Sequence, residues 1–192
     1  MSNFFKGAMT TTCIALLRGV NVGGKNIIKM DMLKQCFEDM GFSDVKTYIQ
    51  SGNVIFRTID IDKRKLIETI EIQLLKTFSI ETTTVVLTSD ELMEVVEKAP
   101  ENFGLEPEKY RYDVWFLLLP VTAKEIMSNV RLREGVDFLQ AGENAIYISR
   151  LISESSRSYL TRVIQTPVYK KITIRNWNTT RKLLEMTNKI VI

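Results

Sequence analysis

The sequence predicts an α+β protein made of two ferredoxin-like units of βαββαβ type, packed together. Two observations predict this fold. Short strand-type runs alternate with helical patterns, and a hairpin signal occurs in each half of the chain. The composition, 45% hydrophobic and 26% charged, is that of an ordinary globular protein. A chain of 192 residues can bury a core without disulfides or metals.

The first unit is expected over residues 9–99. The continuous apolar run Thr11–Leu17 predicts a strand covered on both faces. An amphipathic helix is expected to open at Asp31 and to stop at Gly41. The remaining predicted elements are a hairpin with strands 45–49 and 54–56, a helix over 62–78, a strand over 82–87, and a helix that a capping box at 88–91 opens and that runs to Ala99.

The second unit is expected over residues 110–192, after a linker at 100–109. It repeats the element order of the first unit without visible identity between the two halves. Its predicted elements are a buried strand over 112–119, a short helix opened by a capping box at 122–125, a hairpin with strands 138–140 and 145–148, a helix over 155–164, an extended piece at 172–174 and a C-terminal helix over 178–188.

The sequence contains no histidine, and this excludes many reactions. A Ser-His-Asp triad, a Cys-His pair, a His-ligated zinc and a histidine general base are all impossible. The two cysteines, Cys13 and Cys36, have apolar neighbours and are interpreted as buried small hydrophobes. We therefore expect no metal site and no cofactor.

The location in the cell is predicted from what the chain lacks. No apolar run approaches the roughly 20 residues of a membrane span. Residues 1–8 have no signal-peptide character, and we interpret them as a mobile leader ahead of Met9. The sequence therefore predicts a cytoplasmic protein that does not bind membranes. Residues 150–192 carry nine basic and two acidic side chains, which suits either an anionic partner or a solvated helix face.

The first candidate site is a glycine-rich loop after the first strand. Residues 19–25 match the phosphate-binding pattern G-x-x-x-x-G-K, but Asn26 stands where a Ser or Thr would hold magnesium. An ATP- or GTP-hydrolysing enzyme is therefore disfavoured. The alternative to a binding loop is a loop whose glycines are needed only for their backbone angles. The candidate ligand-binding residues of this loop are Arg18, Asn21, Gly23, Gly24, Lys25 and Asn26.

Two further segments carry candidate ligand-binding residues. The tip of the first hairpin offers polar side chains, although glycine and asparagine there also suit a simple turn. The start of the last helix offers an anion seat and a ring for stacking, against the alternative of a helix cap and a core tryptophan. The candidates are Gln50, Ser51 and Asn53 at the tip, and Arg175, Asn176, Trp177 and Asn178 at the helix start.

The three segments Ala15–Asn26, Thr47–Val54 and Arg175–Thr179 together resemble the bacterial family of unknown function numbered 1697 (DUF1697). The resemblance runs from about Thr11 to the C-terminus. It implies a small cytoplasmic two-part α+β protein. It implies no established activity, so it identifies no catalytic residue. It also implies that the three polar segments are the family's signature, which favours their meeting in one place.

The leading hypothesis is a site between the two halves for an anion, either a nucleotide, a phosphorylated metabolite or a nucleic-acid segment. Arg18, Lys25 and Arg175 would meet the negative charge, and Trp177 would stack. One alternative is an imidazole-free enzyme acting on a phosphorylated substrate, with Lys25 or a carboxylate as base. The other alternative is a dimeric protein-interaction module in which the polar segments are only turns. The oligomeric state stays open.

Overall fold

The computed structural model describes residues 10–22, 24, 26–59 and 62–188. The chain divides into two compact units. The first ends at Ser89 and takes in the chain from Met186 onward, and the second spans Asp90–Glu185. The linker was predicted at 100–109, later in the chain than this division, and the domain ranges 9–99 and 110–192 stay a prediction. The predicted leader, 1–8, lies outside the described residues.

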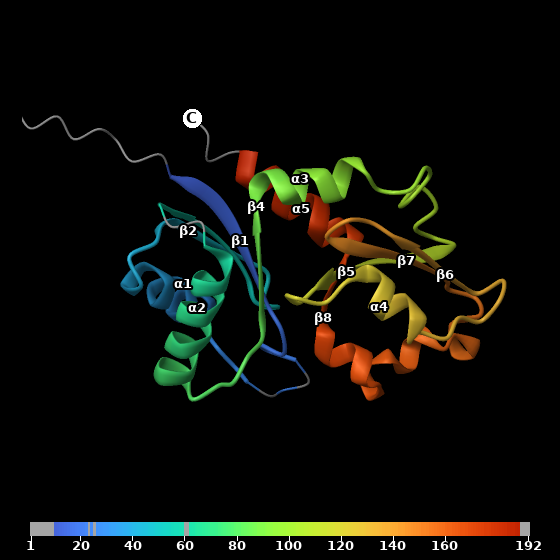
Figure 1. The fold of residues 1–192 in the computed structure, drawn as a ribbon, viewed down its shortest axis with the longest axis horizontal. Coiled ribbons are helices and arrows are strands. Elements are labelled where there is room, and N and C mark those ends of the chain that lie inside the picture. Colours follow the sequence, from blue (N-terminus) through green and yellow to red (C-terminus); the bar gives the residue numbers. More distant parts are fainter. Residues whose placement is uncertain (1–9, 23, 25, 60–61, 189–192) are drawn as a thin grey trace, which may run out of the picture. The chain divides into compact units, whose positions relative to one another are not determined.

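The first unit is built on a four-stranded antiparallel sheet in the order β2-β3-β1-β4. Two helices lie on the same face of this sheet (Figure 1). Strand β1 occupies the middle of the sheet and pairs with both β3 and β4. The elements are β1 (Thr11–Leu17), α1 (Met30–Asp39), β2 (Ser43–Tyr48), β3 (Asn53–Thr58), α2 (Lys63–Phe78) and β4 (Thr84–Thr88).

The core of the first unit lies between its sheet and its helices. Alternate residues of β1, including Ala15 and Leu17, pack against both helices, while Ile14 and Leu16 on the opposite face of the strand are also fully buried. The prediction of a strand covered on both faces is therefore confirmed. The rings of Phe37, Phe42 and Phe56 pack together between α1 and the sheet, with ring centroids 4.4–5.9 Å apart.

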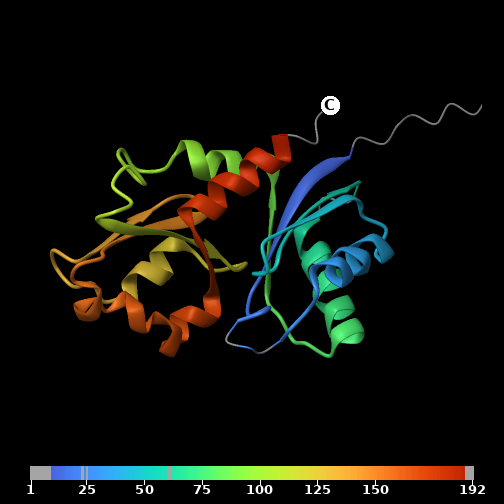
Figure 2. The ribbon, with the colours of Figure 1, turned by 180° about the vertical axis from the view of Figure 1, so that it is seen from behind.

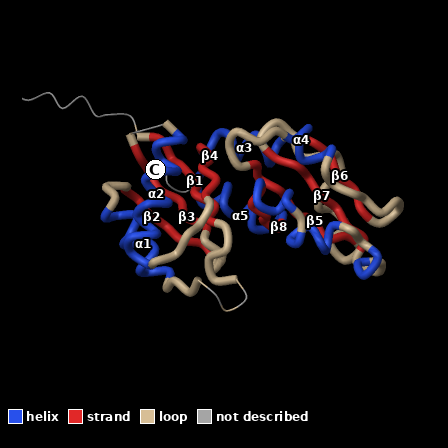
Figure 3. Tube along the Cα trace, turned by 60° about the horizontal axis from the view of Figure 1, so that its bottom comes forward, coloured by secondary structure: helices blue, strands red, loops and turns tan. Residues whose placement is uncertain are grey.

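The second unit contains another four-stranded antiparallel sheet, in the order β6-β7-β5-β8. The strand order of both sheets can be followed in Figure 3. The elements are α3 (Ser89–Glu97), β5 (Tyr110–Leu117), α4 (Ala123–Ser128), β6 (Asp137–Ala141), β7 (Ala145–Leu151), β8 (Ile172–Asn176) and α5 (Trp177–Asn188). The hydroxyl of Thr122 accepts a 3.2 Å hydrogen bond from the Glu125 N–H, which confirms the predicted cap of α4.

The two faces of the second sheet are covered differently (Figure 2). On one face, Trp115 packs with Ile126 of α4 and with the segment between β7 and β8. On the other face, the ring of Phe103 contacts Tyr112, Tyr147 and Trp177, with centroids 4.9–5.5 Å apart. The Tyr147 hydroxyl donates a 2.7 Å hydrogen bond to the Val95 carbonyl, which joins α3 to the same face.

The prediction of one continuous helix over 155–164 is wrong. The chain instead forms three short 3₁₀ helices, η1 (Ser155–Arg157), η2 (Leu160–Gln165) and η3 (Pro167–Lys171). Ser158 has extended backbone angles, φ −64° and ψ 134°, which separate η1 from η2. Its hydroxyl accepts from the Leu160 N–H, and the Asp137 carboxylate accepts from the Tyr159 N–H. These side-chain acceptors replace the carbonyls that an α-helix would supply.

Among the described residues, none of the helices combines the length and the apolar character needed to cross a bilayer.

Candidate functional site

The glycine-rich loop and the hairpin tip of the first unit meet in the structure. Asn21 joins them, because its side-chain amide donates to the Ile28 and Gln50 carbonyls at 2.9 Å each. Its Oδ1 accepts from the Ile28 N–H at 2.7 Å. Asn21 adopts a positive φ of 55°, a conformation that asparagine tolerates better than most residues. Two of the three predicted segments are thus neighbours, held together by one of the predicted residues.

Other amides of this region are also engaged within the first unit. Asn26 donates to the Gly19 carbonyl at 3.0 Å, and Asn53 donates to the Tyr48 carbonyl and to the Ser51 hydroxyl. Arg18 donates to the Thr83 hydroxyl at 2.9 Å. Gln50 is exposed and Gly24 lies in open space. Gly23 and Lys25 lie outside the described residues.

We expect Asn21→Gly to lower the free energy of unfolding by about 2 kcal/mol, since three hydrogen bonds are lost while glycine keeps the positive φ without strain. Asn26→Gly is the matched control, with a similar φ of 52° and a single hydrogen bond in an exposed position. Its expected cost is about 0.5 kcal/mol. Urea unfolding measures both. Equal stability of Asn21→Gly and the wild type would contradict a structural role for Asn21.

The third predicted segment lies in the second unit, at the junction of β8 and α5. Asn176 caps the helix, because its Oδ1 accepts from the Asn178 N–H at 3.0 Å, and its amide donates to the Tyr112 carbonyl at 3.0 Å. The Trp177 indole is buried, with its ring centroid 5.1 Å from that of Phe103. Asn176 therefore acts as the helix cap and Trp177 as a core residue, as the alternative interpretation of this segment expected. A role for Trp177 in stacking on a ligand stays a prediction.

Arg175 is buried beside Trp177. Its guanidinium donates to the Thr173 hydroxyl at 3.1 Å and to the Ile174 carbonyl at 2.9 Å. Burial lowers its pKa to about 10, and the nearby Tyr169 opposes this shift. Even so, the side chain stays protonated at neutral pH. How Arg175 lies relative to the loop of the first unit stays a prediction.

A pocket of about 890 Å³ opens on one face of the second sheet, beside this junction. Its floor is formed by side chains that antiparallel pairing brings together. Arg111 of β5 pairs with Arg150 of β7, and Asp113 of β5 pairs with Asn176 of β8. The walls are largely apolar and include Ile148, Leu160, Val163, Ile164 and Ile174. Three of the predicted residues, Asn176, Trp177 and Asn178, border this pocket.

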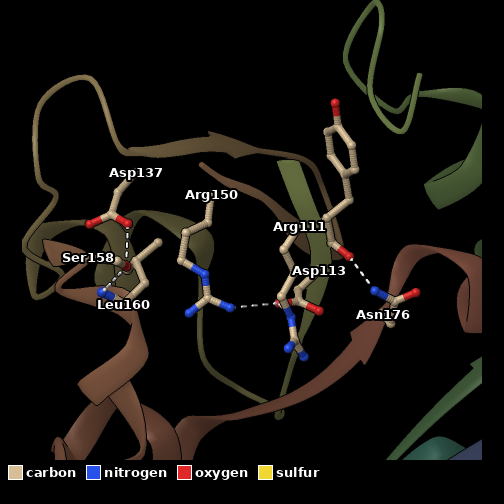
Figure 4. Close-up of polar contacts among 8 residues, drawn as sticks. Arg111, Asp113, Asp137, Arg150, Ser158, Leu160 and Asn176 are labelled. Carbon is tan, nitrogen blue, oxygen red and sulfur yellow. Dashed lines mark hydrogen bonds and ion pairs between the residues drawn. The ribbon is translucent and has the colours of Figure 1, made fainter. Parts of the chain in front are cut away.

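Both floor arginines contact the same carboxylate (Figure 4). Arg111 Nε lies 3.0 Å from Asp113 Oδ2, and Arg150 Nη2 lies 3.6 Å from the same oxygen. The Arg111 side chain is 59% exposed, whereas those of Arg150 and Asp113 are only 13% and 8% exposed. Asp113 Oδ1 is buried and has no hydrogen-bond partner within the described part of the chain. The floor therefore holds two cationic groups against one carboxylate.

The electrostatic environment of Arg150 reflects this arrangement. Burial lowers its pKa, the carboxylate of Asp113 raises it, and the neighbouring Arg111 lowers it again. The carboxylate of Asp137 also raises it, with a smaller effect. Two like charges directly opposite each other on paired strands destabilise a sheet, and only one carboxylate lies directly between them. An added anion at this position would relieve the repulsion that remains.

One wall of the pocket is held in place by Asp137 at the start of β6. Its Oδ1 accepts a short hydrogen bond from the Ser158 hydroxyl, and its Oδ2 accepts from the Arg133 and Tyr159 N–H groups at 2.9 and 3.0 Å. Asp137 is only 4% exposed. Because Ser158 and Tyr159 lead directly into η2, this carboxylate fixes the segment that carries Leu160 and Val163 to the pocket.

The floor residues Arg111, Asp113 and Arg150 were missed by the interpretation of the sequence. A signal for two of them existed, since Arg111, Asp113 and Trp115 alternate along β5 and so share one face of the strand. Arg150 joins them only through the register of β7 against β5. The described residues contain no cluster of three or more acidic or cysteine side chains that could hold a metal ion.

Comparison with known proteins places the chain in a family. The model of the family described as "Protein of unknown function (DUF1697)" matches residues 9–147. The chain belongs to the DUF1697 family. This confirms the family that the sequence resembles. The matched residues include the glycine-rich loop, the hairpin tip and residues 111–113 of the pocket, while the third segment, Arg175–Thr179, lies beyond the matched range.

A solved structure is similar to this DUF1697 protein over most of its length. The structure described as that of the conserved bacterial protein SP0830 from Streptococcus pneumoniae has 28% sequence identity and a TM-score of 0.81. The match covers 93% of this chain and 99% of that chain. No curated protein matches.

Proposed function

We propose that this protein binds a small phosphate-bearing anion, and that the pocket of the second unit is its binding site. The observation that carries the proposal is the pair of arginines on the pocket floor, Arg111 and Arg150, which share a single carboxylate. Nucleotides and phosphorylated metabolites are the ligands of this class that the sequence predicts.

The chemistry of arginine supports an oxyanion as ligand. A guanidinium presents several N–H donors in a planar fork that suits phosphate, and it remains charged at all physiological pH values. Both arginines contact the one oxygen Asp113 Oδ2, and their remaining N–H donors can bind a second acceptor group. Arg150 is largely buried, and an anion bound there would be partly removed from screening by solvent.

The size and the lining of the pocket also support a small molecule. A volume of about 890 Å³ falls in the range of ligand-binding cavities, which combine apolar walls with a few polar groups. The exposed start of α5 adds Asn178 to the rim. The loop of the first unit, with Arg18 and Lys25, and its hairpin tip, with Gln50, stay a second predicted contact region for the same class of ligand.

Two finer classifications belong with this proposal. The shared order of the two sheets, β2-β3-β1-β4 and β6-β7-β5-β8, supports a ferredoxin-like assignment for each unit. A cytoplasmic location is the proposed setting, because phosphorylated metabolites and nucleotides are abundant there.

The proposal is tested by comparing how the wild type and the double variant Arg111→Gln/Arg150→Gln bind phosphate compounds. Calorimetric titration with inorganic phosphate, pyrophosphate and nucleoside 5′-phosphates is expected to show wild-type binding that weakens about tenfold or more in the variant, because charge-assisted hydrogen bonds are lost. Arg131→Gln is the matched control, since Arg131 is exposed and lies outside the pocket lining. Unchanged binding in the paired variant, with its melting temperature retained, would contradict the proposal.

A further inference from the structure

We propose that the pocket of the second unit binds a soluble phosphomonoester whose carbon chain is apolar, and that this chain packs against Ile152 and Ile164. The inference rests on the proposed function, because it places the phosphate on Arg111 and Arg150. It narrows the ligand from any phosphorylated metabolite to one with an alkyl group next to the phosphate. A sugar phosphate of the same length fits this pocket less well.

Two large apolar side chains of the pocket are exposed. Ile152 is 44% exposed and Ile164 is 60% exposed, and both line the cavity. A single exposed isoleucine is ordinary in a globular protein. Two of them that border one cavity together with a pair of arginines are a different case, because the apolar part of a bound anion would displace water from both.

Strand β7 places Ile152 next to the floor arginines. The Ile152 N–H donates a 2.9 Å hydrogen bond to the Lys109 carbonyl, which continues the pairing of β7 with β5 by one residue. Alternate residues of a strand share a face, so Ile152 lies on the face of Arg150, and Arg111 is paired with Arg150. Residues two apart along a strand are separated by about 7 Å, so a chain of a few carbons on a phosphate held by the arginines can contact Ile152.

The second apolar wall comes from η2. Leu160 and Val163 are three residues apart in this helix, and both are buried in the core of the second unit. A 3₁₀ helix has three residues per turn, so Thr161 and Ile164 form the neighbouring row along the helix. Both residues of this row line the pocket. The buried row therefore fixes η2 against the sheet, and the adjacent row presents Ile164 to a ligand.

Several polar side chains of the pocket are already hydrogen-bonded within the protein. The Asn176 side chain accepts from the Asn178 N–H and donates to the Tyr112 carbonyl, at 3.0 Å each. The Thr161 hydroxyl donates to the Ser158 carbonyl at 2.8 Å. Ligand hydroxyl groups packed against the two isoleucines would lose their hydrogen bonds to water, and an alkyl chain has no such loss. These contacts favour an alkyl chain over a sugar.

Three matched phosphomonoesters test the inference by titration of the wild type followed by NMR. Butyl phosphate carries the alkyl chain, methyl phosphate carries only its first carbon, and erythritol 4-phosphate carries the butyl skeleton with a hydroxyl group on every other carbon. We expect butyl phosphate to bind about tenfold more tightly than either of the others, because each methylene group removed from water adds to the affinity. Equal binding of the three esters, with loss of all three in Arg111→Gln/Arg150→Gln, would overturn the inference and leave the anion site standing.

The double variant Ile152→Thr/Ile164→Thr tests where the chain lies. Threonine keeps the β-branched shape of isoleucine, and both positions are exposed, so the fold is expected to be retained. The preference for butyl over methyl phosphate is expected to fall from about tenfold to about threefold or less, because apolar contact area is lost. Ile59→Thr is the matched control, since Ile59 is 68% exposed and lies in the first unit, outside the pocket lining. A full preference retained by the double variant would overturn the inference.

A lipid headgroup is the other source of a phosphomonoester with apolar chains. Cosedimentation with vesicles of equal parts phosphatidylcholine and phosphatidic acid is expected to show no binding, because the acyl chains stay inside the bilayer and cannot reach the isoleucines. Vesicle binding without a preference for butyl phosphate in solution would overturn the inference. Absence of binding by inorganic phosphate and by all three esters would overturn both proposals. The wild-type comparison decides the inference even if the double isoleucine variant fails to fold.

Discussion

Gly104→Ala is expected to lower the free energy of unfolding by about 3 kcal/mol, through a steric clash and an unfavourable backbone conformation. A Cβ atom at this position would lie 2.3 Å from Trp177 Nε1 and 2.4 Å from its Cδ1. The indole is itself held by Phe103 and is only 6% exposed, so it has little room to move away. Gly104 also has φ +88°, which alanine adopts only with strain.

Gly135→Ala is the control that separates the two causes. Gly135 lies in the same unit with a similar φ of +73°, but a Cβ there meets nothing within 4 Å. Its expected cost is therefore only the backbone strain, about 1 kcal/mol. Urea unfolding monitored by circular dichroism measures both variants. Equal destabilisation of the two would show that the contact with Trp177 is unimportant, and the structural account of this tryptophan would fail.

Asp137→Ala is expected to lower the free energy of unfolding by about 4 kcal/mol, because three donors lose their acceptor at one site. The donors are the Ser158 hydroxyl and the N–H groups of Arg133 and Tyr159. Removing the carboxylate leaves these groups unsatisfied in a site that is only 4% exposed. Local opening should be largest in residues 158–165, where the carboxylate holds the pocket wall.

Two measurements test this expectation for Asp137. Denaturant unfolding gives the stability, and amide hydrogen exchange shows whether the loss of protection is concentrated in 158–165. Glu143→Ala is the matched control, because Glu143 is an exposed carboxylate in the turn between β6 and β7. Its expected effect is within about 0.5 kcal/mol. Unchanged exchange in 158–165 of Asp137→Ala would refute the role of this carboxylate as an anchor.

The elements with strong local signals could be predicted from the sequence. The run Thr11–Leu17 is strand β1 with the expected bounds, and Gly41 with φ +87° follows α1 as a stop signal should. The helix over 155–164 failed because its pattern looked helical while a distant carboxylate, Asp137, competed for the backbone N–H of Tyr159. Such a competitor is invisible until the tertiary structure brings β6 beside the segment.

The candidate site was only partly predictable, for a similar reason. The polar residues of the glycine-rich loop were predicted to bind a ligand, yet the Asn21 side chain forms its hydrogen bonds with the backbone of Ile28 and Gln50. The arginines of the pocket floor stand 39 positions apart in the chain, and neither occurs in a motif. Their proximity depends on the pairing of Arg111 with Arg150 across β5 and β7. Strand register is set by the packing of whole sheets, so single-sequence patterns do not reveal it.

An NMR titration of the isotope-labelled wild type with inorganic phosphate tests the central claim most directly. The account predicts that the largest saturable shifts occur at the backbone amides of Arg111, Asp113, Arg150 and Asn176, and that Arg131 stays unaffected. Saturable shifts confined to other parts of the protein, with the floor of the second unit's pocket silent, would contradict it.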